Sequence, residues 1–132
     1  MKHKLIIALD NLTKDEAKNL VNKICAENFI YIDRLIFKVN DLISLIWFEG
    51  LKDIFWEKKV SIMLDGKYHD IWNTISNYLI ALKKSWLSNQ VEFFTIHASN
   101  SYECLKDLIK TRNELELKNI KFLAITLLTS LD

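Results

Sequence analysis

Five short apolar runs recur along the chain, and each is nearly continuous rather than alternating. The runs cover residues 5–10, 35–40, 60–65, 92–99 and 122–130 and are rich in Ile, Val, Phe and Thr. Strands that are buried on both faces, as in a parallel sheet, have this continuous pattern. The runs therefore predict five buried β-strands.

Helical patterns separate these runs. After Thr13, apolar residues recur at spacings that place them on one helix face: Ala17, Leu20, Val21 and Ile24. Thr13 is a suitable N-cap, and Glu16 three residues later completes a capping box. Three further helices are expected, from Asp41 or Ser44 to about Glu57, from about Trp72 to Leu87 and from about Ser101 to Leu115.

Strict alternation of buried strands and helices implies a parallel sheet with right-handed crossovers. Two architectures fit this order: an open doubly wound sheet, or part of a (β/α)8 barrel. Neither GxGxxG nor GxxxxGK[ST] occurs, which weakens the nucleotide-binding open-sheet interpretation. Because no linker rich in Gly, Ser or Pro divides the chain, we expect residues 1–132 to form a single domain.

Polar side chains follow the predicted strands, at the end where a barrel collects its reactive groups. They are Asp10, Lys38, Asp65, Lys67, His97, Ser99, Thr129 and Ser130. Asp65 and Lys67 are two residues apart and so point to the same face of the sheet, while Gly66 points to the other. With Asp10 and Lys38 at the ends of neighbouring strands, the charges would alternate. An ammonium group held between carboxylates is a candidate proton donor to negative charge that develops on carbon.

Composition limits the partners of the chain. A formal net charge of +1 provides no electrostatic reason to expect a nucleic-acid or anionic-membrane partner. The N-terminal apolar run breaks at Asp10, too early for a signal-peptide core, and no segment approaches the ~18 uncharged apolar residues of a membrane span. Cys25 and Cys104 belong to no cluster with metal-ligand spacing. We expect them to be reduced, buried and structural, as in a cytoplasmic protein.

The stretch DGKYHDIWNT, residues 65–74, resembles the D-x-K-x-x-D-I-P-N-T signature of the orotidine 5'-phosphate decarboxylase family. ALD (8–10), FKV (37–39), IHAS (96–99) and ITLLTSLD (125–132) resemble that family's motifs at strands one, two, four and five, in the same order. A lone DxKxxD would indicate only a wider superfamily of sugar-phosphate decarboxylases and aldolases. The combination narrows the resemblance to the orotidylate branch. It implies an α/β fold, a partial (β/α)8 (TIM) barrel of about five parallel strands and four helices that lacks the C-terminal strands.

The resemblance also implies roles for individual residues. Lys67 would donate a proton to C6 of the pyrimidine after carbon dioxide leaves, and Asp65 would lie against the departing carboxylate. Lys38 would complete the charged network and contact the ribose, and Asp10 would hydrogen-bond the ribose hydroxyls. Thr129 would meet the pyrimidine ring.

In this family the last acid of the signature crosses a dimer interface. Asp70, with Ile71 and Thr74, would therefore serve the site of a partner subunit. The family uses neither a metal nor an organic cofactor, and its catalysis comes from electrostatic preorganisation. The expected partners are thus the small-molecule substrate and either a second copy of the chain or a complementary C-terminal chain.

The chain departs from the family pattern in length and at a few positions. A (β/α)8 barrel takes roughly 250 residues, and the missing part would carry strands six to eight with the phosphate-gripping loop. Trp72 replaces the proline of the signature. Asn40, Asn100 and Ser101 replace glycines. Asn tolerates a left-handed conformation, and Ser tolerates it less well. We expect the N-terminal portion of an enzyme that converts orotidine 5'-monophosphate to UMP in de novo pyrimidine synthesis, weak or inactive alone. The alternative is a non-catalytic half-barrel, either a remnant or an assembly partner of a complementary chain.

Ordinary structural interpretations remain open for several residues. Charged residues at strand ends are often solvated ion pairs, and His97 is expected to hydrogen-bond within the barrel. A metal site at His69 and His97 would need further ligands. The four tryptophans are expected to pack helices against the sheet or against a partner: Trp47, Trp56, Trp72 and Trp86.

Overall fold

The computed structural model describes residues 3–127 and has an alternating α/β order in this range. The strands are β1 (Leu5–Ala8), β2 (Leu35–Val39), β3 (Ser61–Tyr68), β4 (Val91–His97) and β5 (Lys121–Ile125). The α-helices are α1 (Lys14–Glu27), α2 (Asp41–Phe55), α3 (Trp72–Lys84) and α4 (Tyr102–Glu114). Two short 3-10 helices, η1 (Phe29–Arg34) and η2 (Leu87–Asn89), precede β2 and β4. Thr129 and Ser130 lie outside the described residues.

The positions of the predicted strands and α-helices are confirmed, with shifts of a few residues at their ends. The prediction that all five strands are buried is wrong for β1 and β5, because each lies at an edge of the sheet and contains no fully buried residue. At the start of α1, the Thr13 hydroxyl accepts a hydrogen bond from the Glu16 backbone N–H at 3.3 Å. The Glu16 carboxylate accepts one from the Thr13 backbone N–H at 2.8 Å, which completes the capping box. Helix α3 stops at Lys84, three residues before the expected end, because Trp86 adopts a left-handed conformation that a helix cannot continue through.

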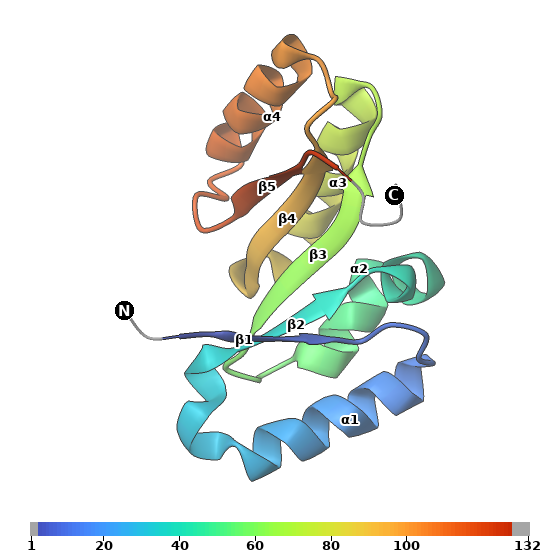
Figure 1. Ribbon diagram of the computed structural model, residues 1–132, viewed down its shortest axis with the longest axis vertical. Helices are drawn as coiled ribbons and strands as arrows, with labels where there is room; N and C mark the ends of the chain where they lie inside the picture. The colour runs from blue at the N-terminus through green and yellow to red at the C-terminus, as the bar shows by residue number, and fades with distance from the viewer. Residues whose placement is uncertain (1–2, 128–132) are drawn as a thin grey trace.

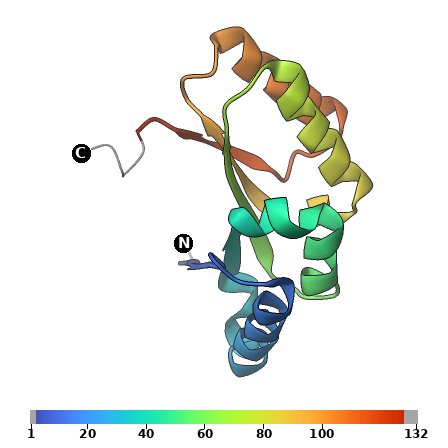
Figure 2. The ribbon, with the colours of Figure 1, turned by 90° about the vertical axis from the view of Figure 1, so that its right-hand side faces the viewer.

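The five strands form one parallel sheet in the order β1-β2-β3-β4-β5. A doubly wound sheet reverses its strand order at a switch point, and this sheet does not. Sequential right-handed crossovers place every connecting helix on the same face. Figures 1 and 2 show that arrangement: the α-helices lie along one side of a strongly twisted sheet, and the other side carries none. The fold is that of a partial TIM barrel.

The core lies between the sheet and the helices. Alternate strand residues point into it, and Phe37, Leu64 and Phe94 are fully buried there. Buried helix residues cover them, among them Leu42, Leu51, Ile75, Leu79 and Leu108. Burying one such side chain contributes about 1.5–3 kcal/mol, so this layer supplies the main favourable term for folding.

Strands β1 and β5 form the two edges of the described sheet, each with one neighbouring strand. Leu5 and Ile6 on β1 are 59% and 49% exposed. Apolar side chains on an edge strand are unusual, because such a row can pair with another chain. In the part of the chain that is described, no helix is long and apolar enough to cross a membrane.

None of the residues that replace the family's glycines has a positive φ angle. Asn40 has φ −129° and Ser101 has φ −58°; Ser101 is the extended N-cap of α4, and its hydroxyl accepts a hydrogen bond from the Cys104 backbone N–H. Positive φ angles occur instead at six other described residues: Asn11, Trp47, Glu57, Lys67, Trp86 and Glu116. Trp47 interrupts α2 with φ 55° and ψ −176°, a region that is essentially reserved for glycine.

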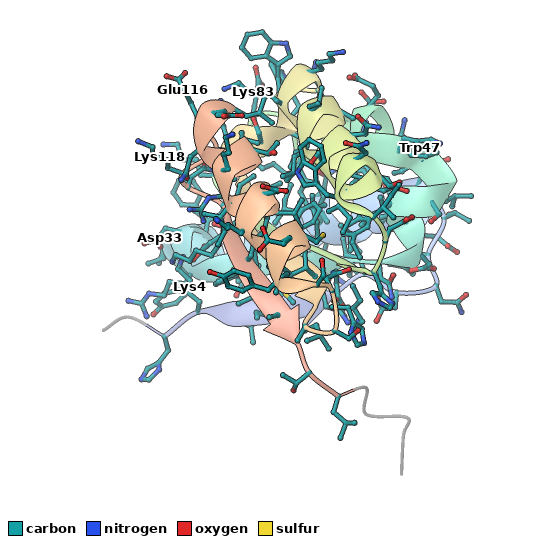
Figure 3. All side chains as sticks on the ribbon, turned by 90° about the horizontal axis from the view of Figure 1, so that it is seen from above. Lys4, Asp33, Trp47, Lys83, Glu116 and Lys118 are labelled. Carbon is teal, nitrogen blue, oxygen red and sulfur yellow. The ribbon has the colours of Figure 1, made fainter. Side chains whose placement is uncertain are left out.

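The tryptophans do not pack against the sheet as expected. Their exposed fractions are 60% for Trp47, 56% for Trp56, 40% for Trp72 and 71% for Trp86. Figure 3 shows Trp47 on α2, on the opposite side of the molecule from Lys4. The part of the expectation that concerns the sheet is wrong, because Leu, Ile and Phe side chains of the helices cover the sheet and leave the indoles outside. Packing of the tryptophans against a partner stays a prediction. Both cysteines, by contrast, are buried and free, as predicted.

Candidate active site

Four charged side chains form a continuous chain of ion pairs across the carboxyl ends of β1, β2 and β3. The Lys38 ammonium lies 3.4 Å from the Asp10 carboxylate and 3.6 Å from the Asp65 carboxylate. The Lys67 ammonium lies 2.7 Å from the same oxygen of Asp65, Oδ2. The sequence predicted this alternation of charges, and the structure brings all four residues together.

The ion pairs lie on the face of the sheet that carries no helix. Phe37 and Val39 belong to the buried core on the helix side, so Lys38 between them points to the opposite face. Leu64 likewise enters the core and Asp65 points away from it. The charged residues thus occupy the concave face that a barrel of this type would enclose.

Asp65 is the buried centre of the group. Its side chain is only 5% exposed, against 25% for Lys38, 36% for Lys67 and 51% for Asp10. A buried carboxylate is costly unless cations and hydrogen-bond donors surround it. The two ammonium groups therefore compensate Asp65, while their exposed parts stay available to a ligand.

A bulge in β3 shapes this arrangement. Leu64 pairs with Phe94 and Tyr68 pairs with Ile96, so the stretch between Leu64 and Tyr68 has two more residues than the facing stretch of β4. Lys67, within the bulge, has φ 45°. A bulge re-aims side chains and is common beside functional sites. Here it also lets β3 run to Tyr68, three residues beyond the expected strand end.

Gly66 is required by the close approach of an aromatic ring. A Cβ at this position would lie 2.4 Å from Cζ of Tyr68. The Tyr68 ring stacks on Phe94 with a centroid distance of 4.7 Å, and burial raises the pKa of its phenol well above the usual range. Because the ring is packed in this way, only glycine fits between Asp65 and Lys67.

Thr95 on β4 belongs to the same group and was missed in the sequence. Its hydroxyl accepts a hydrogen bond from the Lys67 backbone N–H at 2.8 Å and lies 3.1 Å from Oδ1 of Asp65. Thr95 sits in the middle of an apolar run, EFFTIHAS, where threonine is typical of a strand. Its place two residues before His97, on the same strand face as the charged group, was the one available signal.

Asp70, Ile71 and Thr74 form no ion pair or hydrogen bond with the four charged side chains. The Asp70 carboxylate accepts a hydrogen bond from the Ile71 backbone N–H at 2.7 Å and is exposed, and Ile71 is 68% exposed. Thr74, in the first turn of α3, lines a surface hollow of about 270 Å³ with Trp47 and Tyr78. Thr129, the remaining predicted binding residue, lies outside the described residues.

His97 forms hydrogen bonds within the site region, as predicted. Its Nδ1 lies 2.6 Å from the Ser99 hydroxyl, which is also 3.3 Å from Nε2 of His69. This contact between Ser99 and His97 was not predicted, because the position of a strand end does not determine the rotamers of two nearby side chains. Within residues 3–127, no group of three or more His, Cys, Asp or Glu side chains is arranged to hold a metal ion.

A second charged cluster lies near the opposite, amino-terminal end of the sheet. Glu92 on β4 pairs with Lys4 at 2.5 Å and with Lys121 on β5 at 3.7 Å. Burial by itself would raise the pKa of the Glu92 carboxyl, but hydrogen bonds from Lys4 and Ser61 outweigh it and lower that pKa. This cluster links β1, β4 and β5 across the helix-free face and is separate from the candidate active site.

Comparison with known proteins agrees with the motifs. Residues 3–132 match the family described as "Orotidine 5'-phosphate decarboxylase / HUMPS family". The chain is 31% identical to an orotidine 5'-phosphate decarboxylase of Prochlorococcus marinus strain NATL1A, over 96% of this chain and 50% of that protein. It is also 31% identical to the orotidine 5'-phosphate decarboxylase of Heliobacterium modesticaldum, over 98% of this chain and 51% of that protein.

The chain thus spans about half the length of the curated relatives it matches. The match nevertheless covers nearly every residue of the chain, including the DxKxxD stretch and each of the strand-end residues that form the ion pairs. On this evidence the chain belongs to the orotidine 5'-phosphate decarboxylase / HUMPS family.

Proposed function

We propose that the chain supplies the part of an orotidine 5'-phosphate decarboxylase site that performs the chemical step. The substrate would be orotidine 5'-monophosphate, and the product would be UMP for pyrimidine nucleotide synthesis. The observation that carries the proposal is the buried Asp65 carboxylate held at 2.7 Å from the Lys67 ammonium. Membership of the family supports the same reaction.

In the proposed reaction, the bond between C6 of the pyrimidine and its carboxylate breaks, and carbon dioxide leaves. The electron pair stays on C6 and takes a proton from the Lys67 ammonium. Asp65, next to the departing carboxylate, disfavours the negatively charged ground state, while Lys67 stabilises the charge that develops on carbon. Lys67 is suited to this role because 36% of its side chain remains exposed while Asp65 holds its ammonium group.

The ribose would bind beside this pair. Lys38 and Asp10 extend the ion-pair chain from β3 to β1, and both are more exposed than Asp65. Their ammonium and carboxylate groups are suited to hydrogen-bonding sugar hydroxyls. Thr129 would contact the pyrimidine ring.

Asp70, Ile71 and Thr74 would act in the site of a second subunit, in a homodimer. Asp70 and Ile71 are exposed, Thr74 is half-buried, and none of the three pairs with Asp65, which supports this assignment. The remaining strands of the barrel, with the phosphate-binding residues, would come from a complementary chain that pairs with the open edges at β1 and β5. We further propose that residues 1–132 act as one domain in the cytoplasm, with weak or no activity alone.

A non-catalytic half-barrel that binds a partner chain is the second candidate. It is favoured by one observation, the exposed apolar side chains Leu5 and Ile6 on the β1 edge. Such an edge fits strand pairing with another polypeptide.

One experiment separates the two functions. Conversion of orotidine 5'-monophosphate to UMP is measured with this chain alone, and then with the uncovered half of the Prochlorococcus marinus relative added. The Lys67→Ala chain is run in parallel, with Lys14→Ala as the matched control, because Lys14 also pairs with an aspartate but lies on α1. Turnover that appears on mixing and disappears only with Lys67→Ala supports the enzyme. Complex formation without turnover favours the binding half-barrel.

A further inference from the structure

Thr95 is a fully buried polar residue at the centre of the candidate active site. It lies on β4, opposite the bulge of β3, and its exposed fraction is 0%. A buried hydroxyl must satisfy its hydrogen-bonding capacity inside the protein. Its partners therefore reveal what it holds in place.

The hydroxyl of Thr95 connects three parts of the bulge. It accepts a hydrogen bond from the Lys67 backbone N–H at 2.8 Å. It lies 3.1 Å from Oδ1 of Asp65 and 3.4 Å from the carbonyl oxygen of Leu64. A hydroxyl has only one hydrogen to donate. Oδ1 of Asp65 is the stronger acceptor, because it carries negative charge and lies closer than the Leu64 carbonyl oxygen.

This contact decides which way the Asp65 carboxylate faces. With Oδ1 turned toward Thr95, Oδ2 faces both ammonium groups, at 2.7 Å from Lys67 and 3.6 Å from Lys38. Rotation of the carboxylate would break the Thr95 hydrogen bond and turn Oδ2 away from both ammonium groups.

The second contact holds the backbone of the bulge. Extra residues in a bulge lose their partners in the strand ladder, so the Lys67 N–H needs another acceptor. The Thr95 side chain is that acceptor, and it stabilises Lys67 at φ 45°, a conformation that is unfavourable for a residue with a Cβ. The same hydroxyl thus holds both members of the Asp65–Lys67 pair.

We infer that Thr95 is a positioning residue, whose hydroxyl orients the Asp65 carboxylate and anchors the Lys67 backbone so that the two charged groups meet. The inference rests on the proposed function for its catalytic meaning. The hydrogen bonds of Thr95 can be tested whether or not the chain is catalytically active.

The test compares three variants of the full chain by NMR. Thr95→Val keeps the volume and removes the hydroxyl, Thr95→Ser keeps the hydroxyl, and Thr111→Val on α4 is the matched control. Amide hydrogen exchange at Lys67 becomes about tenfold faster in Thr95→Val, the size of one lost hydrogen bond. The side-chain carboxyl carbon-13 resonance of Asp65 shifts in the same variant. Both readouts return to the wild-type values in Thr95→Ser and do not change in Thr111→Val.

Unchanged exchange at Lys67 and an unchanged Asp65 resonance in Thr95→Val would overturn the inference, as would a failure of serine to restore them. If the valine variant does not fold, Thr95→Ala replaces it, because alanine removes the hydroxyl without placing a methyl group beside Asp65.

A kinetic arm uses the mixed, active form. There Thr95→Val lowers kcat about tenfold or more and leaves KM within about twofold, and Thr95→Ser restores kcat. An equal loss in Thr111→Val would reduce the role of Thr95 to general stability and overturn the inference. If the wild-type mixture shows no turnover, the proposed function fails, and the NMR readouts still decide the role of Thr95.

Discussion

Two ion pairs of nearly equal length offer a direct test of how burial strengthens the candidate site. The Lys67–Asp65 pair measures 2.7 Å and the Lys14–Asp53 pair 2.6 Å. The aspartate side chain is 5% exposed in the first pair and 59% exposed in the second. Replacing each lysine with methionine removes the charge and keeps most of the apolar stem, so the pairs differ mainly in their surroundings.

The expected loss for Lys67→Met follows from the geometry. Attraction between unit charges at 2.7 Å is about 1.5 kcal/mol at the dielectric constant of water and about 6 kcal/mol at an effective dielectric constant of ~20. Since 36% of Lys67 is exposed, solvent screens the pair, and Lys38 at 3.6 Å continues to compensate Asp65. We expect a loss of about 2 kcal/mol in the free energy of unfolding, below the 3–5 kcal/mol typical of fully buried pairs.

Lys14→Met should cost no measurable stability. The pair with Asp53 is solvated, and Lys14 lies in the first turn of α1, where a positive charge opposes the helix dipole. Urea unfolding at pH 7 measures both variants against the wild type, at low salt and at high salt. High salt should hardly change the loss in unfolding free energy of Lys67→Met, because salt screens a buried ion pair only weakly. Equal losses in the two variants, or a Lys67→Met loss that salt abolishes, would refute the burial argument.

Three further predictions concern catalysis, pH and backbone strain. In the mixed, active form, Lys67→Ala should abolish turnover, whereas His97→Ala should mainly lower the melting temperature; equal losses of turnover with folding unchanged would contradict the assigned roles. The pKa of Glu92 is lowered in the folded state, so its stabilising effect is present above its ordinary value of 4.5 and is lost as the pH falls through the folded value. Glu92→Gln should therefore be less stable than the wild type at pH 7 and equally stable in acid, and a constant difference in urea titrations across pH would argue against this. Trp47→Gly should raise the unfolding free energy by about 1 kcal/mol, because it relieves φ 55° at an indole that is 60% exposed; a loss of stability would mean that the indole packs more strongly than its exposure indicates.

Local patterns in the sequence predicted what depends on local interactions. The capping box of Thr13 and Glu16 is formed within four residues and appears as expected. The strands followed from continuous apolar runs, since those residues fill the core on one side of the sheet. Parallel strands also end at a common edge of the sheet, so the sequence alone predicts that the charged residues at their ends lie close together.

Features set by contacts between distant segments were not predictable in this way. Thr95 and Lys67 are 28 residues apart, and their hydrogen bond exists only because β3 bulges against β4. The three residues that replace glycines were the positions where the sequence raised the question of a left-handed conformation. Positive φ angles occur at other positions: Asn11 follows the local preference of asparagine, whereas at Trp47, Lys67 and Trp86 tertiary packing outweighs local preference.

The strands that carry the ion pairs show whether the candidate active site can form in half a barrel. Lys38 lies on β2, Asp65 and Lys67 lie on β3, and Asp10 lies in the turn directly after β1; these three strands are consecutive neighbours in the sheet. Thr95, which holds the bulge, comes from the next strand, β4. The charged group is therefore assembled entirely by strand pairs of this chain and does not depend on closure of the barrel. Closure would instead exclude water from the helix-free face and strengthen the same electrostatic interactions. It follows that a complementary chain should increase turnover without changing the hydrogen bond between Thr95 and Lys67, because the group it encloses is already in place.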